Sequence, residues 1–152
     1  MFITGHLASS YLVSRVTGLH WSLLAGAAVF PDLVDKGLRC AGLFATGRHV
    51  AHNLFALMLT VVAVAFWWGG RAGISWAVGY VVHLAGDLPF SWDMPWFYPL
   101  EWGAWHNSVP QAFMGMSWEQ LLLDVCVTAV ALGLLFLDLR KRAGELADPP
   151  SD

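Results

Sequence analysis

Two ionisable residues, His83 and Asp87, interrupt an apolar stretch where a lipid-facing helix would carry leucine or valine. Residues four apart in an α-helix project from one face about one turn from each other, and two ligands of one metal ion can have this spacing. A histidine and an aspartate at this spacing can also hydrogen-bond to each other or to neighbouring backbone in a helical bundle. The spacing alone leaves both a metal site and a structural pair open.

Two aspartates and two histidines elsewhere in the chain repeat this ambiguity. Asp32 and Asp35 are three apart, so they can share a helix face, but they can equally cap a helix and interact with its dipole. His49 and His52 lie at the start of a second apolar stretch, where interfacial histidines are common. Each pair alone has a structural explanation as well as a functional one.

The three groups together carry a stronger argument than each alone. Ionisable groups at membrane depth are costly and are normally paired, hydrated or functional. Imidazole and carboxylate suit Zn²⁺ or a similar first-row ion, and a catalytic zinc site takes about three protein ligands and leaves a position for water. Cys40 and Cys126 are isolated, which argues against a closed structural zinc site. We therefore expect a divalent-metal site, with Zn²⁺ as the first choice and Mn²⁺ or Fe²⁺ as alternatives.

The composition indicates a membrane protein. Of the 152 residues, 57% are hydrophobic and only 12% are charged, with 9 Trp and 9 Phe. The mean hydropathy of +0.57 would leave a soluble protein of this size with a largely apolar surface, so the lipid bilayer is the expected partner. No basic run with interleaved aromatic residues is present, which excludes the electrostatic signature of nucleic-acid binding.

The elements that must position these residues are predicted to be helices. We expect an all-α, polytopic membrane helical bundle of about four to five helices, in which Pro31 ends the second helix. A single domain is expected over residues 1–142, with a disordered polar tail over residues 143–152. The predicted helices and spans are Thr4–Val16, Trp21–Phe30, Val50–Trp68, Gly73–Pro89 and Trp118–Leu137.

The basic residues predict an orientation. If the spans alternate, five basic residues lie on the side of the tail and three lie on the side of the metal site. By the positive-inside rule, the tail is then cytoplasmic and the site lies on the outer side of the membrane. The two groups are Arg15, Arg71, Arg140, Lys141 and Arg142 on one side, and Lys36, Arg39 and Arg48 on the other.

Five short motifs carry a resemblance to a known family. The motifs are Gly5-His6, Pro31-Asp32 with Asp35, Arg48 to His52-Asn53, Gly79-Tyr80 with His83 and Asp87, and the stretch Trp96 to Trp102. With them, the stretch from Thr4 to Trp102 resembles the membrane-bound metal-dependent hydrolases of bacteria and archaea, also described as LexA-binding inner-membrane hydrolases. Four features differ from the family pattern: the second aspartate, Asp35, comes three residues after Asp32 instead of two, Gly47 replaces a histidine, and Ala51 and Asn53 replace threonine and serine.

The order of the histidines and aspartates is also similar, more distantly, to that of zinc-dependent phospholipase C. This similarity implies one ion among Asp32, His52, His83 and Asp87, and a bridge through Asp87 to a second ion held by His6. His49 and His106 are further candidate ligands.

The two resemblances together imply an enzyme of the cytoplasmic (inner) membrane. It would hydrolyse a phosphoester or ester of a lipid-like substrate with a metal-activated water. Asp35 would accept a proton, and Arg48 would bind the anionic phosphate.

Two other classes of function use the same residues. A metal carrier or sensor would need ligands on both sides of the membrane midplane. A non-catalytic membrane adaptor would retain the fold if the differences at Gly47 and Ala51 abolish metal binding.

Overall fold

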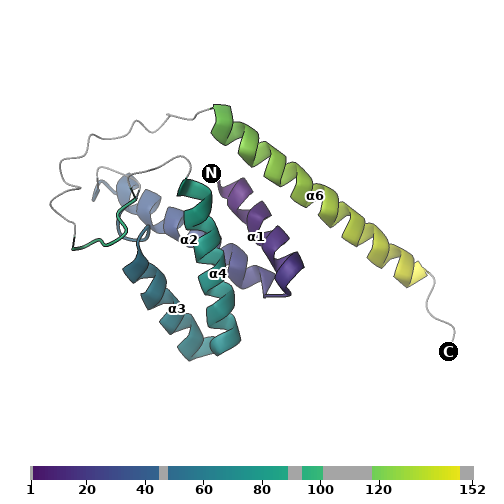
Figure 1. Cartoon of the computed structure of the whole chain (residues 1–152), viewed down its shortest axis with the longest axis horizontal. Helices are drawn as coiled ribbons and strands as arrows, with labels where there is room; N and C mark the ends of the chain where they lie inside the picture. Colours follow the sequence, from purple (N-terminus) through teal and green to yellow (C-terminus); the bar gives the residue numbers. More distant parts are fainter. Residues whose placement is uncertain (1, 45–47, 89–93, 101–117, 148–152) are drawn as a thin grey trace.

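The computed structural model describes residues 2–44, 48–88, 94–100 and 118–147. Within these ranges the chain is all-α and has no strand, as predicted (Figure 1). The helices are α1 (Ile3–Thr17), α2 (Trp21–Cys40), α3 (Leu54–Trp68), α4 (Gly70–Asp87) and α6 (Trp118–Ala147).

Helix α4 lies at the centre of the packed helices. It contacts α1, α2 and α3, while α6 lies at the edge and packs chiefly against α1 (Figure 1). Helices α1 and α6 run in the same direction, because Asp124 near the start of α6 bonds to the start of α1 and Asp138 bonds to Arg15 near its end. The starts of α1 and α6 therefore lie at one end of the molecule, and the ends of both helices lie at the other.

The start of α1 depends on a side chain from α6. Asp124 is buried and accepts hydrogen bonds from the backbone N–H groups of Phe2 and Gly5 and from the hydroxyl of Thr4. The N-cap residue Phe2 has no side-chain acceptor of its own, so Asp124 satisfies donors that the helix leaves without partners. This contact fixes the position of Gly5 and hence of the residue after it, His6.

The predicted helix boundary at Pro31 is wrong. Helix α2 continues through Pro31 to Cys40, and the proline is buried inside it. Proline disturbs the hydrogen bonds of the preceding turn, and the carbonyl of Ala28 in that turn accepts a bond from Nδ1 of His83 at 2.6 Å. The contact from His83 thus uses the carbonyl of Ala28, in the turn before the proline. Asp32 lies within the helix instead of capping it.

One helix in the described part of the chain is long and apolar enough to cross a membrane. It is the segment Trp118–Ala143 of α6, whose most apolar 18-residue window has a mean hydropathy of 2.2 and is only 11% buried. Helix α3 is apolar but has 15 residues, because it begins at Leu54, where Asn53 caps it by accepting a bond from the N–H of Ala56. Of the predicted long apolar stretches Val50–Trp68, Gly73–Pro89 and Trp118–Leu137, the last alone meets this criterion.

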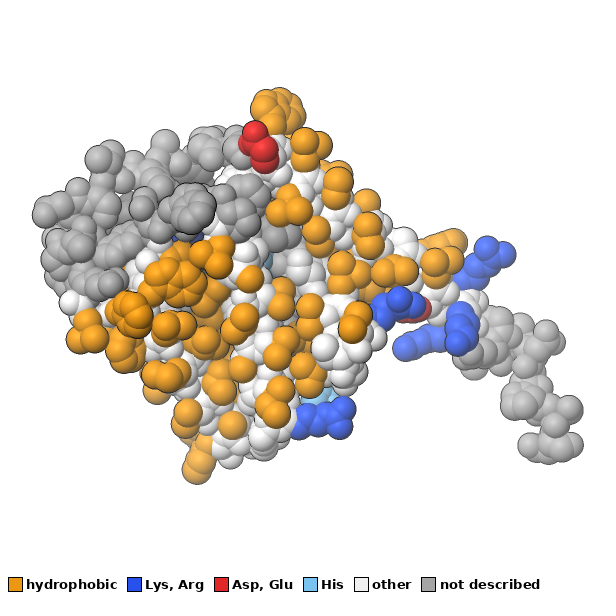
Figure 2. All heavy atoms as spheres, in the orientation of Figure 1, with side chains coloured by type: hydrophobic (Ala, Val, Ile, Leu, Met, Phe, Trp, Pro, Cys, Tyr) orange, Lys and Arg blue, Asp and Glu red, His pale blue; other side chains and the backbone are white. Residues whose placement is uncertain are grey.

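Hydrophobic side chains cover much of the exposed surface, including α3 and α6 (Figure 2). Leu59 is 72% exposed and Phe66 81% exposed on α3, and Phe136 is 64% exposed on α6. These faces are suited to contact with lipid. Helix α6 ends at Ala147, beyond residue 143, where the polar tail was predicted to begin.

Gly79 is required for the close packing of α4 against α2. A Cβ atom at this position would lie 2.7 Å from the Cα atom of Leu24, which is backbone and cannot rotate away. We expect Gly79→Ala to lower the free energy of unfolding by roughly 1–3 kcal/mol, as overpacking does, and to lower the midpoint of thermal unfolding in detergent. Gly37→Ala is the matched control, because a Cβ atom there meets nothing within 4 Å. Equal midpoints for Gly79→Ala and the wild type would contradict this packing.

Candidate metal centre

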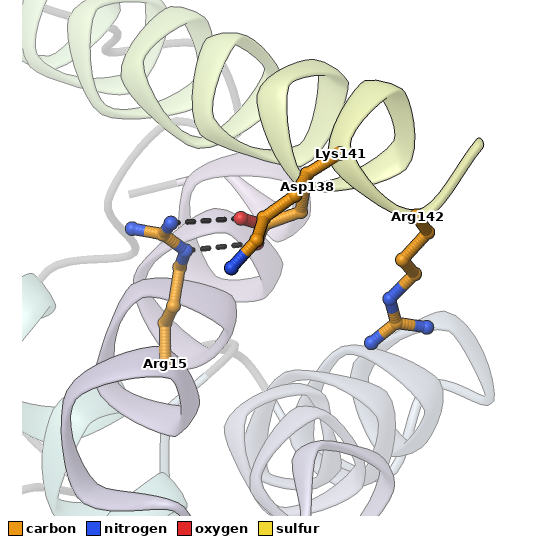
Figure 3. A pocket seen from close by; sticks show the side chains of 4 residues that line it. All are labelled: Arg15, Asp138, Lys141 and Arg142. Atoms are coloured by element: carbon orange, nitrogen blue, oxygen red, sulfur yellow. Dashed lines mark hydrogen bonds and ion pairs between the residues drawn. The ribbon is translucent and has the colours of Figure 1, made fainter. Parts of the chain in front are cut away.

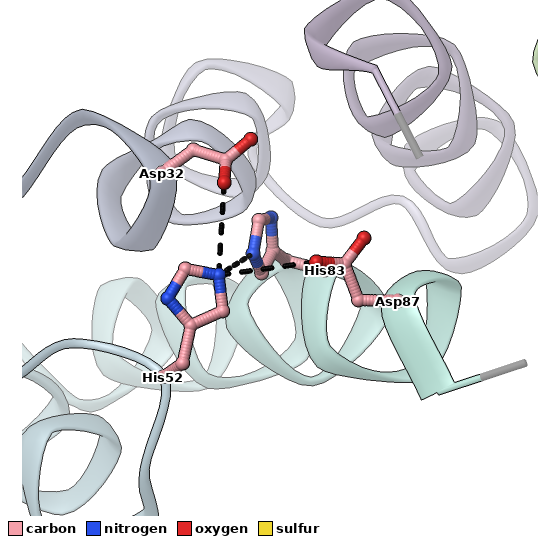
Figure 4. Close-up of side chains that lie close together, drawn as sticks. All are labelled: Asp32, His52, His83 and Asp87. Atoms are coloured by element: carbon pink, nitrogen blue, oxygen red, sulfur yellow. Dashed lines mark hydrogen bonds and ion pairs between the residues drawn. The ribbon is translucent and has the colours of Figure 1, made fainter. Parts of the chain in front are cut away.

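Four buried side chains from three elements meet at one point (Figure 4). Asp32 comes from α2, His52 from the loop before α3, and His83 and Asp87 from the C-terminal half of α4. One nitrogen or oxygen atom from each lies within 4.8 Å of the others. The structure therefore brings together four of the five residues predicted as principal metal ligands.

The distances suit a single small cation. Nε2 of His52 lies 3.0 Å from Nε2 of His83, 3.6 Å from Oδ1 of Asp32 and 3.9 Å from Oδ2 of Asp87. Zinc binds nitrogen and carboxylate oxygen at about 2.0–2.2 Å, so two ligands of one ion lie roughly 3–4 Å apart. The three distances from His52 have this spacing, and all four atoms lie within 4.8 Å of one another.

The other ring nitrogen of each histidine is already engaged. Nδ1 of His52 lies 2.7 Å from Oδ2 of Asp35, and Nδ1 of His83 lies 2.6 Å from the carbonyl oxygen of Ala28. A backbone carbonyl can only accept, and an ionised carboxylate likewise, so this network assigns a proton to each Nδ1. In the neutral histidines both Nε2 atoms then carry lone pairs that face each other, and such an arrangement needs a cation or a proton between them.

The carboxylates around His52 make its position attractive to positive charge. Burial alone would lower the pKa of His52, but Asp32 and Asp35 outweigh burial, and the pKa is raised above its ordinary value. A proton therefore competes with a metal ion for this nitrogen.

Asp35 lies behind His52 and organises the loop that carries it. Its carboxylate accepts bonds from the backbone N–H groups of His49 at 2.7 Å and Ala51 at 2.9 Å, besides the bond from His52. Tyr80 adds a hydrogen bond from its hydroxyl to the carbonyl of Ala51. Histidine ligands of metals commonly donate their second N–H to a carboxylate in this way, which fixes the ring orientation.

Two cations balance part of the negative charge. Nζ of Lys36 lies 2.6 Å from Oδ2 of Asp32, and a terminal nitrogen of Arg48 lies 3.0 Å from Oδ2 of Asp87. Together with Asp35, these groups have a formal charge of −1 when the histidines are neutral, which favours a bound cation. Arg48 was predicted at the site and Lys36 was not, although its spacing of four from Asp32 is that of a helical ion pair.

His6 adjoins the cluster on the other oxygen of Asp87. Its Nε2 lies 3.3 Å from Oδ1 of Asp87, and its ring centroid lies 4.1 Å from that of His83. The side chain is 1% exposed, and neither ring nitrogen makes a hydrogen bond with the described residues. A buried imidazole in this state is a candidate ligand, as the sequence predicted.

The structure does not bring the ring of His49 into the cluster. Its Nδ1 lies 2.6 Å from the carbonyl oxygen of Arg48, and the ring packs against Phe44 and Tyr98. Its contribution to the centre is the backbone N–H that binds Asp35. His106 lies outside the described residues.

Over the described residues, these features define an all-α protein with one helix long and apolar enough to cross a membrane and a buried His/Asp cluster that could hold a metal ion. The chain belongs to the YdjM inner membrane protein family, whose sequence pattern matches residues 2–145. No curated protein and no solved structure matches the chain. The prediction of an inner-membrane family is confirmed, while the activity stays a prediction.

Asp35 offers a test of how the centre is held together. Asp35→Asn keeps the size of the side chain but removes its charge and one of its acceptors for the loop and for His52. We expect the affinity for Zn²⁺, measured by competition with a chromogenic chelator, to fall about 10- to 100-fold. Asp138→Asn, which changes a carboxylate on α6 away from the cluster, should leave the affinity unchanged. Equal affinities for Asp35→Asn and the wild type would contradict the positioning role.

Proposed function

We propose that this protein is an integral inner-membrane, metal-dependent hydrolase that acts on a phosphoester or ester of a lipid-like substrate. The observation that carries the proposal is the convergence of two imidazole nitrogens and two carboxylates, with both Nδ1 atoms engaged elsewhere. With a proton on each Nδ1, the two Nε2 atoms face each other at 3.0 Å and need a cation or a proton between them. The set of four side chains is suited to a divalent cation, with Zn²⁺ as the first choice and Mn²⁺ or Fe²⁺ as alternatives.

The residues have distinct roles in this proposal. Asp32, His52, His83 and Asp87 would hold the ion, and His6 with the second oxygen of Asp87 would hold another. A bound metal would lower the pKa of coordinated water and polarise the scissile group. Asp35 would orient His52, since its oxygens already accept three hydrogen bonds, and this role replaces the predicted one of direct proton acceptor.

Arg48 would bind the substrate. Its side chain is 28% exposed while it contacts the buried Asp87, so it links the cluster to the outside. A guanidinium group suits an anionic phosphate better than a neutral ester, because it can donate two parallel hydrogen bonds. This position favours phosphoesters among the candidate substrates.

The charge distribution supports an orientation with the site on the outer side. Arg71 donates a bond to the carbonyl of Gly18 at the C-terminal end of α1, which puts it at the same end of α1 as Arg15 and away from His6. Lys36 and Arg48 lie at the cluster. With α6 crossing the membrane and α3 and α4 embedded beside it, the positive-inside rule would make the Arg15 end cytoplasmic.

Metal content tests the first half of the proposal. We expect the full-length protein, purified in detergent and analysed by elemental mass spectrometry, to contain stoichiometric zinc, manganese or iron. His83→Ala should lose it, because the variant removes one of the four ligands. His49→Ala is the matched control, since it removes a buried histidine three residues from His52 whose ring lies outside the cluster, and it should retain the metal. A wild type without metal, even after reconstitution, would refute the hydrolase and favour the adaptor.

Arg48 tests the substrate class. With bis(p-nitrophenyl) phosphate as a generic phosphodiester, we expect Arg48→Gln to lower kcat/KM about 10- to 100-fold, because one charge-assisted hydrogen bond to the substrate is lost. Metal content should change little, since Arg48 contacts a ligand without being one. Arg39→Gln, a change of a nearby cation on α2, is the control. Unchanged kinetics in Arg48→Gln would show that this arginine does not bind the phosphate.

A further inference from the structure

A second site of different chemistry lies at the opposite end of α1 from His6. Four residues line a cavity of about 490 Å³ there, namely Arg15, Asp138, Lys141 and Arg142 (Figure 3). Three of the four are cations, so the cavity has a formal charge of +2. Arg15 is nine residues from His6 on α1, which places the two sites about 14 Å apart along the helix axis.

The carboxylate in this cavity already accepts three hydrogen bonds. Asp138 receives two bonds from Arg15, from Nε at 2.8 Å and from a terminal nitrogen at 2.7 Å, and a third from the hydroxyl of Tyr11 at 2.8 Å. Its effect is to hold the guanidinium of Arg15 in place. A guanidinium has five N–H groups, so Arg15 retains donors beyond the two that Asp138 uses.

Arg142 adds a second guanidinium to the same cavity. It makes no hydrogen bond or ion pair with the described residues, and in Figure 3 its side chain extends from the same end of α6 as that of Lys141. Two arginines and a lysine line one open cavity, and their charge and their N–H donors suit a phosphate group.

The position of the cavity along α6 indicates where that phosphate comes from. From Trp118 to Arg140 the helix rises about 33 Å, close to the thickness of the hydrocarbon core of a bilayer, about 30 Å. If α6 crosses the membrane, Lys141 and Arg142 lie at the depth of the lipid headgroups. Basic residues directly after a membrane helix attract anionic lipids.

We propose that this cavity binds the phosphate group of an anionic phospholipid. Arg15, held by Asp138, contributes a fixed guanidinium, and Lys141 and Arg142 close on the phosphate from α6. Asp124 connects α6 to the start of α1, near His6. A phosphate in the cavity would connect the two helices at the other end of α1, near Arg15. The inference rests on the basic cavity and on α6 as a membrane helix, and it stands whether or not the centre at His52 binds metal.

The experiment compares three ligands on the full-length protein in neutral detergent. Short-chain phosphatidylglycerol, short-chain phosphatidylcholine with the same acyl chains, and inorganic phosphate are added in turn, and the midpoint of thermal unfolding is followed. We expect phosphatidylglycerol to raise the midpoint more than phosphatidylcholine does, and 1 M NaCl to abolish the difference.

Variants assign the effect to the cavity. The double variant Lys141→Gln/Arg142→Gln removes two exposed cations without breaking the Arg15–Asp138 pair, and it should bind phosphatidylglycerol roughly 30-fold more weakly, at about fivefold per cation. Arg71→Gln, at the same end of α1 but outside the cavity, should bind like the wild type.

Two results would overturn the proposal. One is an equal response to phosphatidylglycerol and phosphatidylcholine, and the other is an equal response of the double variant and the wild type. If inorganic phosphate alone reproduces the full shift and the double variant abolishes it, the site binds phosphate but the lipid as its source is refuted.

Discussion

The arrangement of the candidate metal centre depends on which ring nitrogen of His52 and of His83 carries a proton. Because Nδ1 of His52 bonds to Asp35 and Nδ1 of His83 bonds to the carbonyl of Ala28, both rings turn their other nitrogen towards the same point, 3.0 Å apart. Two lone pairs this close inside a protein repel each other, so positive charge has to be present there. Helix α2 supplies both acceptors, on either side of Pro31. The course of this helix therefore decides which form of each imidazole exists in the centre.

Much of the centre could be predicted from the sequence, because helical spacing is a local property. The spacing of four between His83 and Asp87 shows that both project from one face, and Asp32 is brought to them by the packing of α2 on α4. Spacing alone does not show which histidine of the 48–53 loop enters the cluster, and the prediction of His52 as a principal ligand came from the family resemblance. His49 and His52 have similar neighbours in the sequence, and the path of the loop distinguishes them, since Asp35 binds the backbone of one and the ring of the other.

The wrong helix boundaries in the prediction also arise from contacts that the local sequence does not show. A rule for proline considers the residues next to it in the chain, whereas Pro31 is kept inside α2 by burial and by the contact of His83 with Ala28. Hydropathy does not detect a cap, so the apolar stretch from Val50 gave no sign that Asn53 starts the helix at Leu54. Helix α1 was predicted to within one residue at each end, and it ends where Gly18 adopts a left-handed conformation.

The hydrogen bonds of Asp124 connect the proposed ligand His6 to α6, the helix that is long and apolar enough to cross a membrane. Asp124 belongs to α6 and holds the backbone of Gly5, next to His6, whereas Asp87 belongs to α4, which packs against α1, α2 and α3. A membrane helix adjusts its tilt when the hydrocarbon layer becomes thinner or thicker. A change of tilt in α6 would shift His6 relative to Asp87, while His83 and Asp87 would move together. The thickness of the bilayer would in this way affect the position of His6 relative to Asp87.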